Sequence, residues 1–391
     1  MRLLQSCQIT RGRLNPRRQY GLLILRKLEM VGYGNKAIRW GALASVLSLL
    51  LVSLFIDTSC CRGNKSGDTR SGVLRVANWE DYLAPGTLEE FTKRTGIAVE
   101  LETFPDEDVL LSQVQSDPAR YDVIFPSRDR FCLLLKSKLL APLPRETLTG
   151  REQIDPEYLK VPCDPNGAYF VPYLMGATGI GYNDEHFPNG VNSWRSLLDA
   201  KWASRAAFLN NSDEVLAIAL RMMGLSVNAA DPKDIFAAGE MLAGPVRASR
   251  GMLDPVQIRD GLASGELLIA QTYSGEALWA ARKNPHVRFV LPAEGCVRWV
   301  DLMAIPAEAP HREAALQFLR YMLEPAVNAA CARYLGYDTP NMAARRLLGE
   351  GTGDAAGSGL SLADVQRCEF FTIDQSIRAT RNEVWESLKN R

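Results

Sequence analysis

Patterns typical of strands and helices alternate along residues 73–125, and this order is the feature that most limits the possible folds. Apolar and polar residues alternate in the strand-like runs, and apolar residues recur at helical spacing in the runs between them. The expected strands cover residues 73–77, 98–103 and 121–125, and the expected helices cover residues 86–95 and 107–115. Because helices then connect parallel strands, we predict an α/β fold with a mainly parallel sheet and helices on both faces.

The rest of the chain continues in the same way and points to a second lobe. Expected strands cover residues 206–209, 267–273 and 301–305, and expected helices cover 213–223, 232–242, 276–282, 311–322 and 325–334. A chain of 391 residues with 47% hydrophobic content exceeds one hydrophobic core, so two lobes with a groove between them are expected. The glycine-rich, β-prone stretch at 171–183 is predicted to cross between the lobes as a first hinge.

The N-terminal segment indicates export. Residues 40–56 are uncharged and apolar and follow Lys36 and Arg39, as in a secretory signal. Small residues before Cys60 and Cys61 resemble a bacterial lipobox, so lipidation of Cys60 or Cys61 is expected, although Asp57 is atypical for cleavage before Cys60. A retained membrane anchor is the alternative. Residues 1–59 are therefore assigned as leader, with Met30 as a possible true start, and residues 60–72 as linker.

Charge and cysteine content bear on the charge of the ligand and on the redox compartment of the protein. The whole chain has 45 basic and 45 acidic residues, and its first 59 residues hold nine and two of them. From Cys60 onward 36 basic and 43 acidic residues remain, a net charge of −7, which suits solubility and weakly favours a cationic ligand. Beyond the leader and its cleavage site five cysteines remain. Their odd number and irregular spacing argue against a disulfide framework, although one pair is possible in an oxidising periplasm.

Motifs for catalysis or nucleic-acid binding are not evident. The histidines, His186, His286 and His311, are scattered and lack zinc-ligand spacing or an acid–base dyad. The chain contains neither a G-x-S-x-G elbow nor a P-loop, and no basic patch follows the leader. We therefore predict a protein that is not an enzyme and that uses no metal or cofactor.

Aromatic and acidic residues gather at the ends of expected strands. Trp79 and Tyr82 follow the first strand, Ser127 follows the run 122–126, and Trp299 and Asp301 open another apolar strand. Ligands of open α/β sheets bind where strands end. These segments therefore predict a cleft lined by rings and carboxylates.

Five segments together resemble one known family. They are NWEDYLAPGTLEEFTKRTGI at 78–97, YDVIFPS at 121–127, FVPYLMGATGIGYN at 170–183, RWVDLMAIPAEAPHREAALQFLRYML at 298–323 and GYDTPNMAARRLL at 336–348. In this order, and over residues 73–388, the chain resembles the extracytoplasmic polyamine-binding proteins of ABC importers, the spermidine/putrescine-binding type. The resemblance implies a two-lobed, hinged periplasmic binding protein fold. The first lobe would comprise residues 73–177 with 298–336, and the second 178–297 with 337–391.

The resemblance also implies a set of ligand-binding residues. The positions that match the family are Trp79, Tyr82, Ser127, Glu214, Tyr273, Glu276, Trp299, Asp301 and Tyr337. Tyr273 stands where the family usually has Trp. Three further positions depart from the pattern: Asn211 replaces an acid of spermidine binders, Asp129 lies where an aromatic residue is common, and Phe371 lies near the usual glutamine. The C-terminal tail, residues 368–389, looks closer to the putrescine branch.

These residue types suit a flexible chain that carries ammonium groups. Rings enclose methylene groups and attract ammonium ions through their faces, and carboxylates pair with ammonium groups that have lost their water. Asp301, Glu214 and Glu276 are the candidate carboxylates. Simpler roles compete with binding: Glu214 and Glu276 as solvated acids of a first helical turn, the aromatic residues as core, Ser127 as a helix cap and Asp129 as a surface residue.

The sequence therefore predicts a monomeric, exported and lipid-anchored protein of the periplasmic space. It would capture putrescine or spermidine, close its lobes about residues near 177, 297 and 337, and dock on an ABC permease in the membrane. Alternatives are another small solute, such as an amino acid, an amino sugar or an oxyanion that binds Arg128 and Arg130, or a lipoprotein sensor or scaffold without a role in transport.

Overall fold

A computed structural model describes residues 72–349, apart from 105, 106, 145 and 147, and residues 367–390, apart from 373. The predicted export segment and both candidate lipidation cysteines, Cys60 and Cys61, lie outside the described residues. Within the described ranges, none of the helices has the length and apolar character needed to cross a membrane.

The N-terminal part of the described chain folds as predicted, into parallel strands joined by helices. Its strands are β1 (Leu74–Trp79), β2 (Val99–Phe104) and β3 (Val123–Ile124), and its helices are α3 (Thr87–Thr95), α4 (Glu107–Ser116) and α5 (Arg128–Lys136). Strand β1 pairs in parallel with both β2 and β3. Gly96 ends α3 with a left-handed backbone, φ 75°, which glycine adopts without steric cost. The strand ends that carry Trp79 and Ser127 therefore point to one edge of the sheet.

The middle of the chain forms a second group of strands and helices. Its strands are β5 (Ala206–Leu209), β6 (Met252–Leu253), β7 (Ile269–Tyr273) and β8 (Val287–Val290), and its helices are α6 (Ser212–Met222), α7 (Pro232–Ala248), α8 (Pro255–Ser264) and α9 (Ser274–Lys283). The C-terminal helix α14 (Arg378–Lys389) packs with α6 and α7. Strand β5 pairs in parallel with β6 and β7. Short 3₁₀ helices cover Arg151–Gln153, Pro156–Leu159, Trp194–Ser196, Ala203–Arg205 and Gln375–Ile377.

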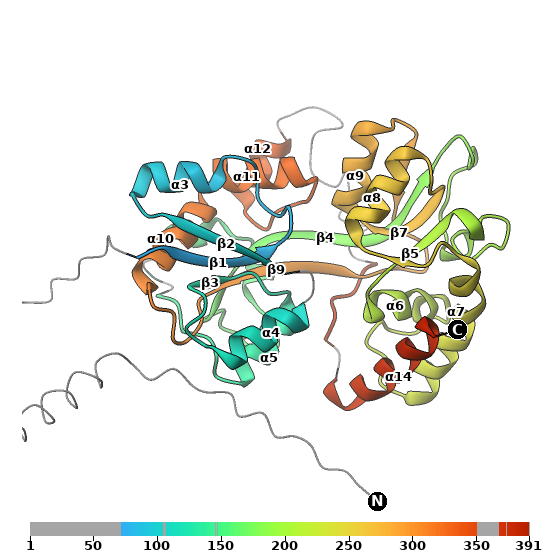
Figure 1. The fold of residues 1–391 in the computed structure, drawn as a ribbon, viewed down its shortest axis with the longest axis horizontal. Helices are drawn as coiled ribbons and strands as arrows, with labels where there is room; N and C mark the ends of the chain where they lie inside the picture. Colours follow the sequence, from blue (N-terminus) through green and yellow to red (C-terminus); the bar gives the residue numbers. More distant parts are fainter. Residues whose placement is uncertain are drawn as a thin grey trace, which may run out of the picture. The chain divides into compact units, whose positions relative to one another are not determined.

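Two strands, β4 (Phe170–Asn183) and β9 (Arg298–Ala304), connect these groups. The sheet order is β2-β1-β3-β9-β4-β7-β5-β6, with β8 also paired to β4. Strand β9 is antiparallel to both β3 and β4, and β4 is antiparallel to β7 and β8. The glycine-rich stretch thus forms one 14-residue strand that runs from one group into the other (Figure 1). Helices α10 (Arg312–Leu323), α11 (Pro325–Leu335) and α12 (Met342–Gly349) follow β9.

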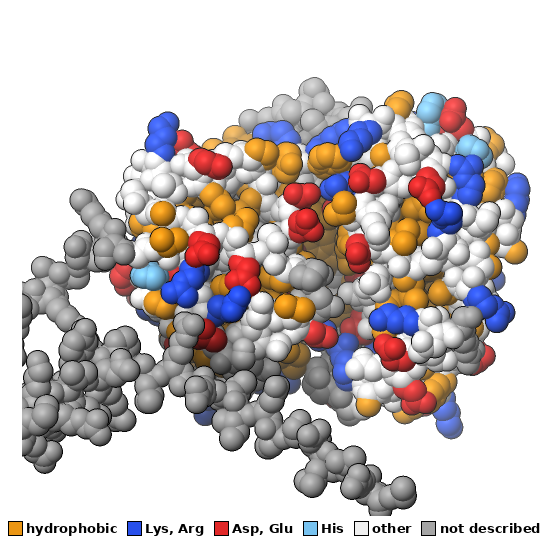
Figure 2. Space-filling view, in the orientation of Figure 1, with side chains coloured by type: hydrophobic (Ala, Val, Ile, Leu, Met, Phe, Trp, Pro, Cys, Tyr) orange, Lys and Arg blue, Asp and Glu red, His pale blue; other side chains and the backbone are white. Residues whose placement is uncertain are grey.

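The apolar side chains form two main cores. The first contains buried residues from 74–174 and 300–348, and the second contains buried residues from 177–296 and 368–388. The change between Leu174 and Ala177 lies within β4. Tyr337, Ala344 and Leu348 pack in the first core, whereas the sequence analysis grouped residues 337–391 with the second lobe. The exact lobe boundaries stay a prediction. The face drawn in Figure 2 is hollowed over β4, and acidic side chains lie along the hollow.

Two disulfides correct the expectation that the cysteines form no framework. Cys132 on α5 is bonded to Cys163, Cys296 is bonded to Cys368, and Cys331 is free and buried. The irregular spacing was uninformative because the folded chain brings together residues that are 31 and 72 positions apart. Beside the second disulfide, Arg298 N donates to Glu369 O at 2.9 Å and Glu369 N donates to Cys296 O at 3.0 Å.

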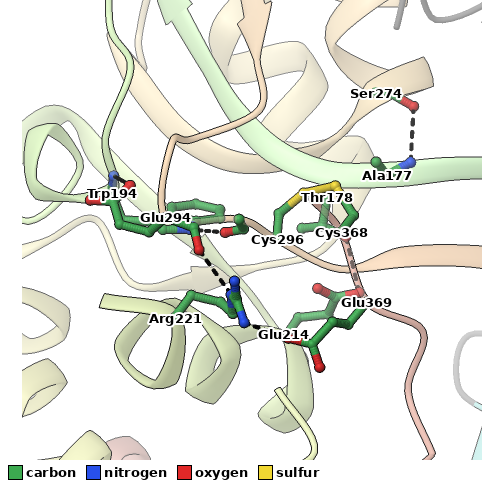
Figure 3. The surroundings of a disulfide bond; sticks show 11 residues. Ala177, Thr178, Trp194, Glu214, Arg221, Ser274, Glu294, Cys296, Cys368 and Glu369 are labelled. Carbon is green, nitrogen blue, oxygen red and sulfur yellow. Dashed lines mark hydrogen bonds and ion pairs between the residues drawn. A yellow bond between two sulfur atoms is a disulfide. The ribbon is translucent and has the colours of Figure 1, made fainter. Parts of the chain in front are cut away.

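The second disulfide therefore attaches the C-terminal segment to the start of β9. Arg221 on α6 also holds this segment. Its guanidinium pairs with the Glu369 carboxylate, and its Nε donates to Glu294 O at 2.9 Å. Figure 3 shows these groups around the disulfide. The segment that leads to α14 is thus held by a covalent bond, a backbone bridge and an ion pair.

We expect Cys368→Ser to lower the free energy of unfolding by about 2–4 kcal/mol, because it opens a long loop in the unfolded chain. Urea denaturation followed by circular dichroism measures this change. Addition of a reductant during denaturation should abolish the difference between the variant and the wild type. A wild-type protein whose stability is insensitive to reductant would contradict the assignment of structural disulfides.

Candidate functional site

Four predicted aromatic residues lie together in or against the first core. The Tyr82 and Tyr337 rings are 5.9 Å apart, the Tyr337 and Trp299 rings 4.9 Å, and the Trp299 and Tyr273 rings 5.9 Å, each pair edge to face. Tyr82 follows β1, Tyr273 ends β7, Trp299 lies on β9 and Tyr337 follows α11. Residues from four separate segments therefore form one set of contacting rings, here called the aromatic cluster.

Two glycines leave the space that this cluster occupies. Gly176 pairs with Trp299 across β4 and β9, and a Cβ built on Gly176 would lie 2.5 Å from the indole. A Cβ on Gly275, in the first turn of α9, would overlap the Tyr337 ring. Any side chain at either position would displace a ring. Gly176 of the crossing strand and Gly275 of α9 thus make room for the packed rings.

Asp301 lies against the aromatic cluster. Tyr82 Oη donates to Asp301 Oδ2 at 2.6 Å, and Asp301 is only 8% exposed. The backbones of Asp301 and Ser127 form an antiparallel bridge. Burial, followed by the charge of Asp129, raises the pKa of Asp301 to about 7, although the hydrogen bond from Tyr82 opposes the shift. Among the described residues, no lysine or arginine forms an ion pair with this carboxyl group.

Glu214 is a second buried acid without a cationic partner among the described residues. It lies in the first turn of α6 and is 4% exposed, so it is not the solvated helix acid that the sequence left open. Thr178 Oγ1 on β4 donates to Glu214 Oε1 at 3.0 Å, and Glu214 Oε2 is buried without a hydrogen-bond partner. Burial raises its pKa to about 8. Asn211, an exposed residue, caps the same helix by accepting from the backbone of Asp213 and Glu214.

Glu276 differs from these two acids because the protein supplies a cation for it. Arg259 Nη1 on α8 lies 3.5 Å from Glu276 Oε2 and stacks on Trp279. Burial raises the pKa of Glu276, and Arg259 opposes the shift. Burial raises the pKa of Tyr273 and Tyr337, and the charge of Glu276 adds to both shifts, so this acid lies near the aromatic cluster on the side of α9.

Ser127 leads to an acid that the sequence analysis missed. Ser127 N donates to Glu107 Oε1 at 2.6 Å, and its Oγ lies 2.8 Å from Glu107 Oε2 and 3.0 Å from Asp129 Oδ1. Ser127 caps no helix through its side chain. Burial and the charge of Asp129 raise the pKa of Glu107 to about 8. The only signal in the sequence was an acid at the start of an expected helix, which is a common surface feature.

Asp129 is only partly exposed and acts on the other acids. Its side chain is 24% exposed, and its charge raises the pKa of Glu107, Glu214 and Asp301. It is therefore not the isolated surface residue that the sequence left open.

Trp79 and Phe371 make their contacts elsewhere. Trp79 packs on Phe104 with ring centroids 4.7 Å apart, and its buried Nε1 has no hydrogen-bond partner. Phe371 packs against the second core. The structure thus joins Tyr82, Tyr273, Trp299, Asp301 and Tyr337 directly, and places Glu214 and Glu276 where their charges act on the same rings. Within the described residues no group of histidine, cysteine and acidic side chains is arranged to hold a metal ion.

Comparisons with known proteins match the chain to a family model of bacterial solute-binding proteins and to named relatives. Residues 87–353 match the family model of the bacterial extracellular solute-binding proteins. The spermidine/putrescine-binding periplasmic protein of Salmonella typhimurium is 35% identical over 280 residues, which are 71% of this chain and 80% of that protein. The putrescine-binding periplasmic protein of Escherichia coli is 29% identical over 342 residues, 81% of this chain and 91% of that protein.

Solved structures agree with this result. The spermidine/putrescine ABC transporter substrate-binding protein of Streptococcus pneumoniae aligns with a TM-score of 0.71 and 28% identity, over 82% of this chain and 99% of that chain. A lipoprotein of Treponema pallidum, at 21% identity and a TM-score of 0.74, has the same fold over 82% of this chain and all of its own. The predicted binding-protein fold is confirmed. The chain belongs to the family of the spermidine/putrescine-binding periplasmic proteins, within the bacterial extracellular solute-binding proteins, and is a binding protein and not an enzyme.

Proposed function

We propose that this protein captures putrescine or spermidine between its two lobes and delivers it to the permease of an ABC importer. The observation that carries the proposal is the pair of buried acids, Asp301 and Glu214, neither of which has a cationic partner among the described residues. Relatives that are named as spermidine/putrescine-binding and putrescine-binding proteins support the same ligand class. Two buried acids without cationic partners suit a ligand that has at least two ammonium groups.

Desolvation explains why the guest must be cationic. A buried carboxylate without a partner is costly, so it stays protonated until a cation arrives. The raised pKa values of Asp301 and Glu214 express this cost. An ammonium group that replaces the proton gains a charge-assisted hydrogen bond. The rings of Tyr82, Trp299 and Tyr337 then cover the methylene groups and attract the charge, at about 0.5–2 kcal/mol for each ring in contact.

An oxyanion is less well supported than a cation. Arg130 Nη2 lies 3.0 Å from Asp108 Oδ1, and Arg128 stacks on Phe370 at 4.3 Å. Both guanidinium groups are thus engaged with the protein, whereas Asp301 and Glu214 have no cationic partner among the described residues. No observation favours a second function over polyamine capture.

The remaining parts of the proposal concern delivery. Closure about β4, β9 and the segment near Tyr337 would enclose the ligand, and it is driven by contacts that the ligand makes only in the closed state. Strand β4 pairs with β9 beside the first core and continues into its pairing with β7, which supports this hinge. We further propose that the mature protein is a monomer held at the membrane by a lipid on Cys60 or Cys61, facing the periplasm. Relatives named as periplasmic support the compartment.

Asp301→Asn should weaken putrescine binding at least tenfold, about 1.4 kcal/mol or more, because the amide cannot neutralise an ammonium group. The asparagine Oδ1 still accepts from Tyr82, so the fold should persist. Isothermal titration calorimetry measures the affinity. Asp184→Asn is the matched control, since Asp184 pairs with Arg288 on the surface. Unchanged affinity in Asp301→Asn would remove this residue from the site.

Polyamine affinity should fall at least tenfold between pH 8 and pH 6. The pKa values of about 7 for Asp301 and about 8 for Glu214 belong to the ligand-free protein. An ammonium group favours the ionised acids, so it lowers both values and releases protons on binding. As the pH falls through this window, protons compete with the ligand and affinity is lost. Calorimetry in two buffers of different ionisation enthalpy counts the protons. Equal affinity at both pH values, with no proton release, would argue against uncompensated acids.

A further inference from the structure

A group of alternating charges lies beside the proposed site and joins the two cores. We call it the interlobe charge cluster. Its members are Glu107, Asp129, Arg130, Asp213, Arg378 and Arg381. The first three lie on α4 and α5, which pack in the first core, and the last three lie on α6 and α14, which pack in the second. The cluster holds three acids and three arginines.

Arg378 connects the two sides of the interlobe charge cluster. Its Nη1 donates to Asp213 Oδ2 at 2.5 Å on its own side, and its Nη2 lies 4.0 Å from Asp129 Oδ2 on the other side. The Nε and Nη2 atoms of Arg378 are buried and have no hydrogen-bond partner. Asp213 also accepts from Arg381 Nη1 at 3.2 Å, and Arg130 lies 3.9 Å from Asp129. The guanidinium of Arg378 is thus held between two carboxylates.

The cluster adjoins the acids assigned to the ligand. Asp129 shares the Ser127 hydroxyl with Glu107, and the Ser127 backbone bridges to Asp301. Asp213 directly precedes Glu214 in the first turn of α6. One hydroxyl proton cannot serve both carboxylates at once, and a proton on Glu107, whose pKa is about 8, removes the conflict. Arg378 is therefore linked to both of these acids, to Asp301 through Asp129 and Ser127 and to Glu214 through Asp213.

We propose that Arg378 acts as a built-in cation that limits the ligand to two ammonium groups, so that the site prefers a diamine to a triamine. The inference rests on the proposed function. It follows from the distribution of charge: arginines already neutralise Asp129 and Asp213, whereas Asp301 and Glu214 lack such partners. A third ammonium group that reached Asp129 would find the carboxylate occupied and a guanidinium beside it. Like charges placed together at a desolvated site select strongly against a ligand.

Arg378→Gln tests the proposal through the ratio of two affinities. Calorimetry with putrescine and with spermidine, on the full-length protein, gives the ratio of their Kd values. We expect the variant to shift this ratio at least tenfold toward spermidine, because Asp129 loses the guanidinium of Arg378, keeps only Arg130 at 3.9 Å, and can then pair with the third ammonium group. Asp213 keeps Arg381 as a partner, so the fold should persist. Circular dichroism and the thermal midpoint check this.

Three further variants separate charge from packing. Arg378→Lys keeps the cation and should keep the wild-type ratio within about threefold, a change of about 0.65 kcal/mol. Asp129→Asn removes an acid but leaves Arg378, and should shift the ratio away from spermidine. Arg288→Gln, which breaks the exposed pair with Asp184, is the matched control and should leave the ratio unchanged.

The outcomes distinguish this inference from the proposed function. A shift toward spermidine in Arg378→Gln, retained selectivity in Arg378→Lys and the opposite shift in Asp129→Asn support the role of Arg378. An unchanged ratio in Arg378→Gln, or equal weakening of both ligands in every variant, overturns it while the polyamine function stands. A wild-type protein that binds neither ligand overturns the proposed function itself.

Discussion

The antiparallel pairing of β4 with β9 is the interaction on which the rest of the structure depends. Each strand contributes to the sheet of the first core, and β4 continues into pairings with β7 and β8 beside the second core. This pairing sets Gly176 opposite Trp299 and places Asp301 next to Ser127. Two independently packed cores therefore meet along a pair of strands, and the aromatic cluster lies at their junction. Because few covalent connections cross there, relative motion of the cores is the expected response to a ligand.

Apart from Glu107, which accepts hydrogen bonds from Ser127, the acids in and beside the site fall into two classes. Asp301 and Glu214 are buried and lack cations among the described residues, and burial raises both of their pKa values. Glu276, Asp129 and Asp213 are paired with arginines. The acids of the first class thus have a cationic partner only if a ligand supplies one. Arginines of the protein neutralise the acids of the second class. On the proposed function, the number of acids in each class would set the selectivity between ligands of different charge.

The sequence predicted much of the fold because local patterns and tertiary structure agree there. The strand–helix alternation before Pro126 and the β-prone run that became β4 were both confirmed, since parallel strands and their helices leave strong periodic signals. The sequence analysis did not predict α5 or α8, and it did not find the two disulfides. Cys296 and Cys368 are 72 residues apart, and no local pattern encodes which distant cysteines meet.

What the sequence alone determined was the class of the protein and the set of chemical groups that it presents: strand-end rings, nearby acids and a resemblance spread along residues 73–388. Only the tertiary structure decided what each group does. Glu214 and Glu276 both open helices, yet one lies against Thr178 without a cation and the other faces Arg259. Glu107 and Arg378 are identified as residues near the site only by their contacts with distant segments. The reason is physical. The protonation state of a side chain, and whether it has a partner, depend on its neighbours in space and on the water it has lost, and the neighbouring residues in the sequence fix neither of these.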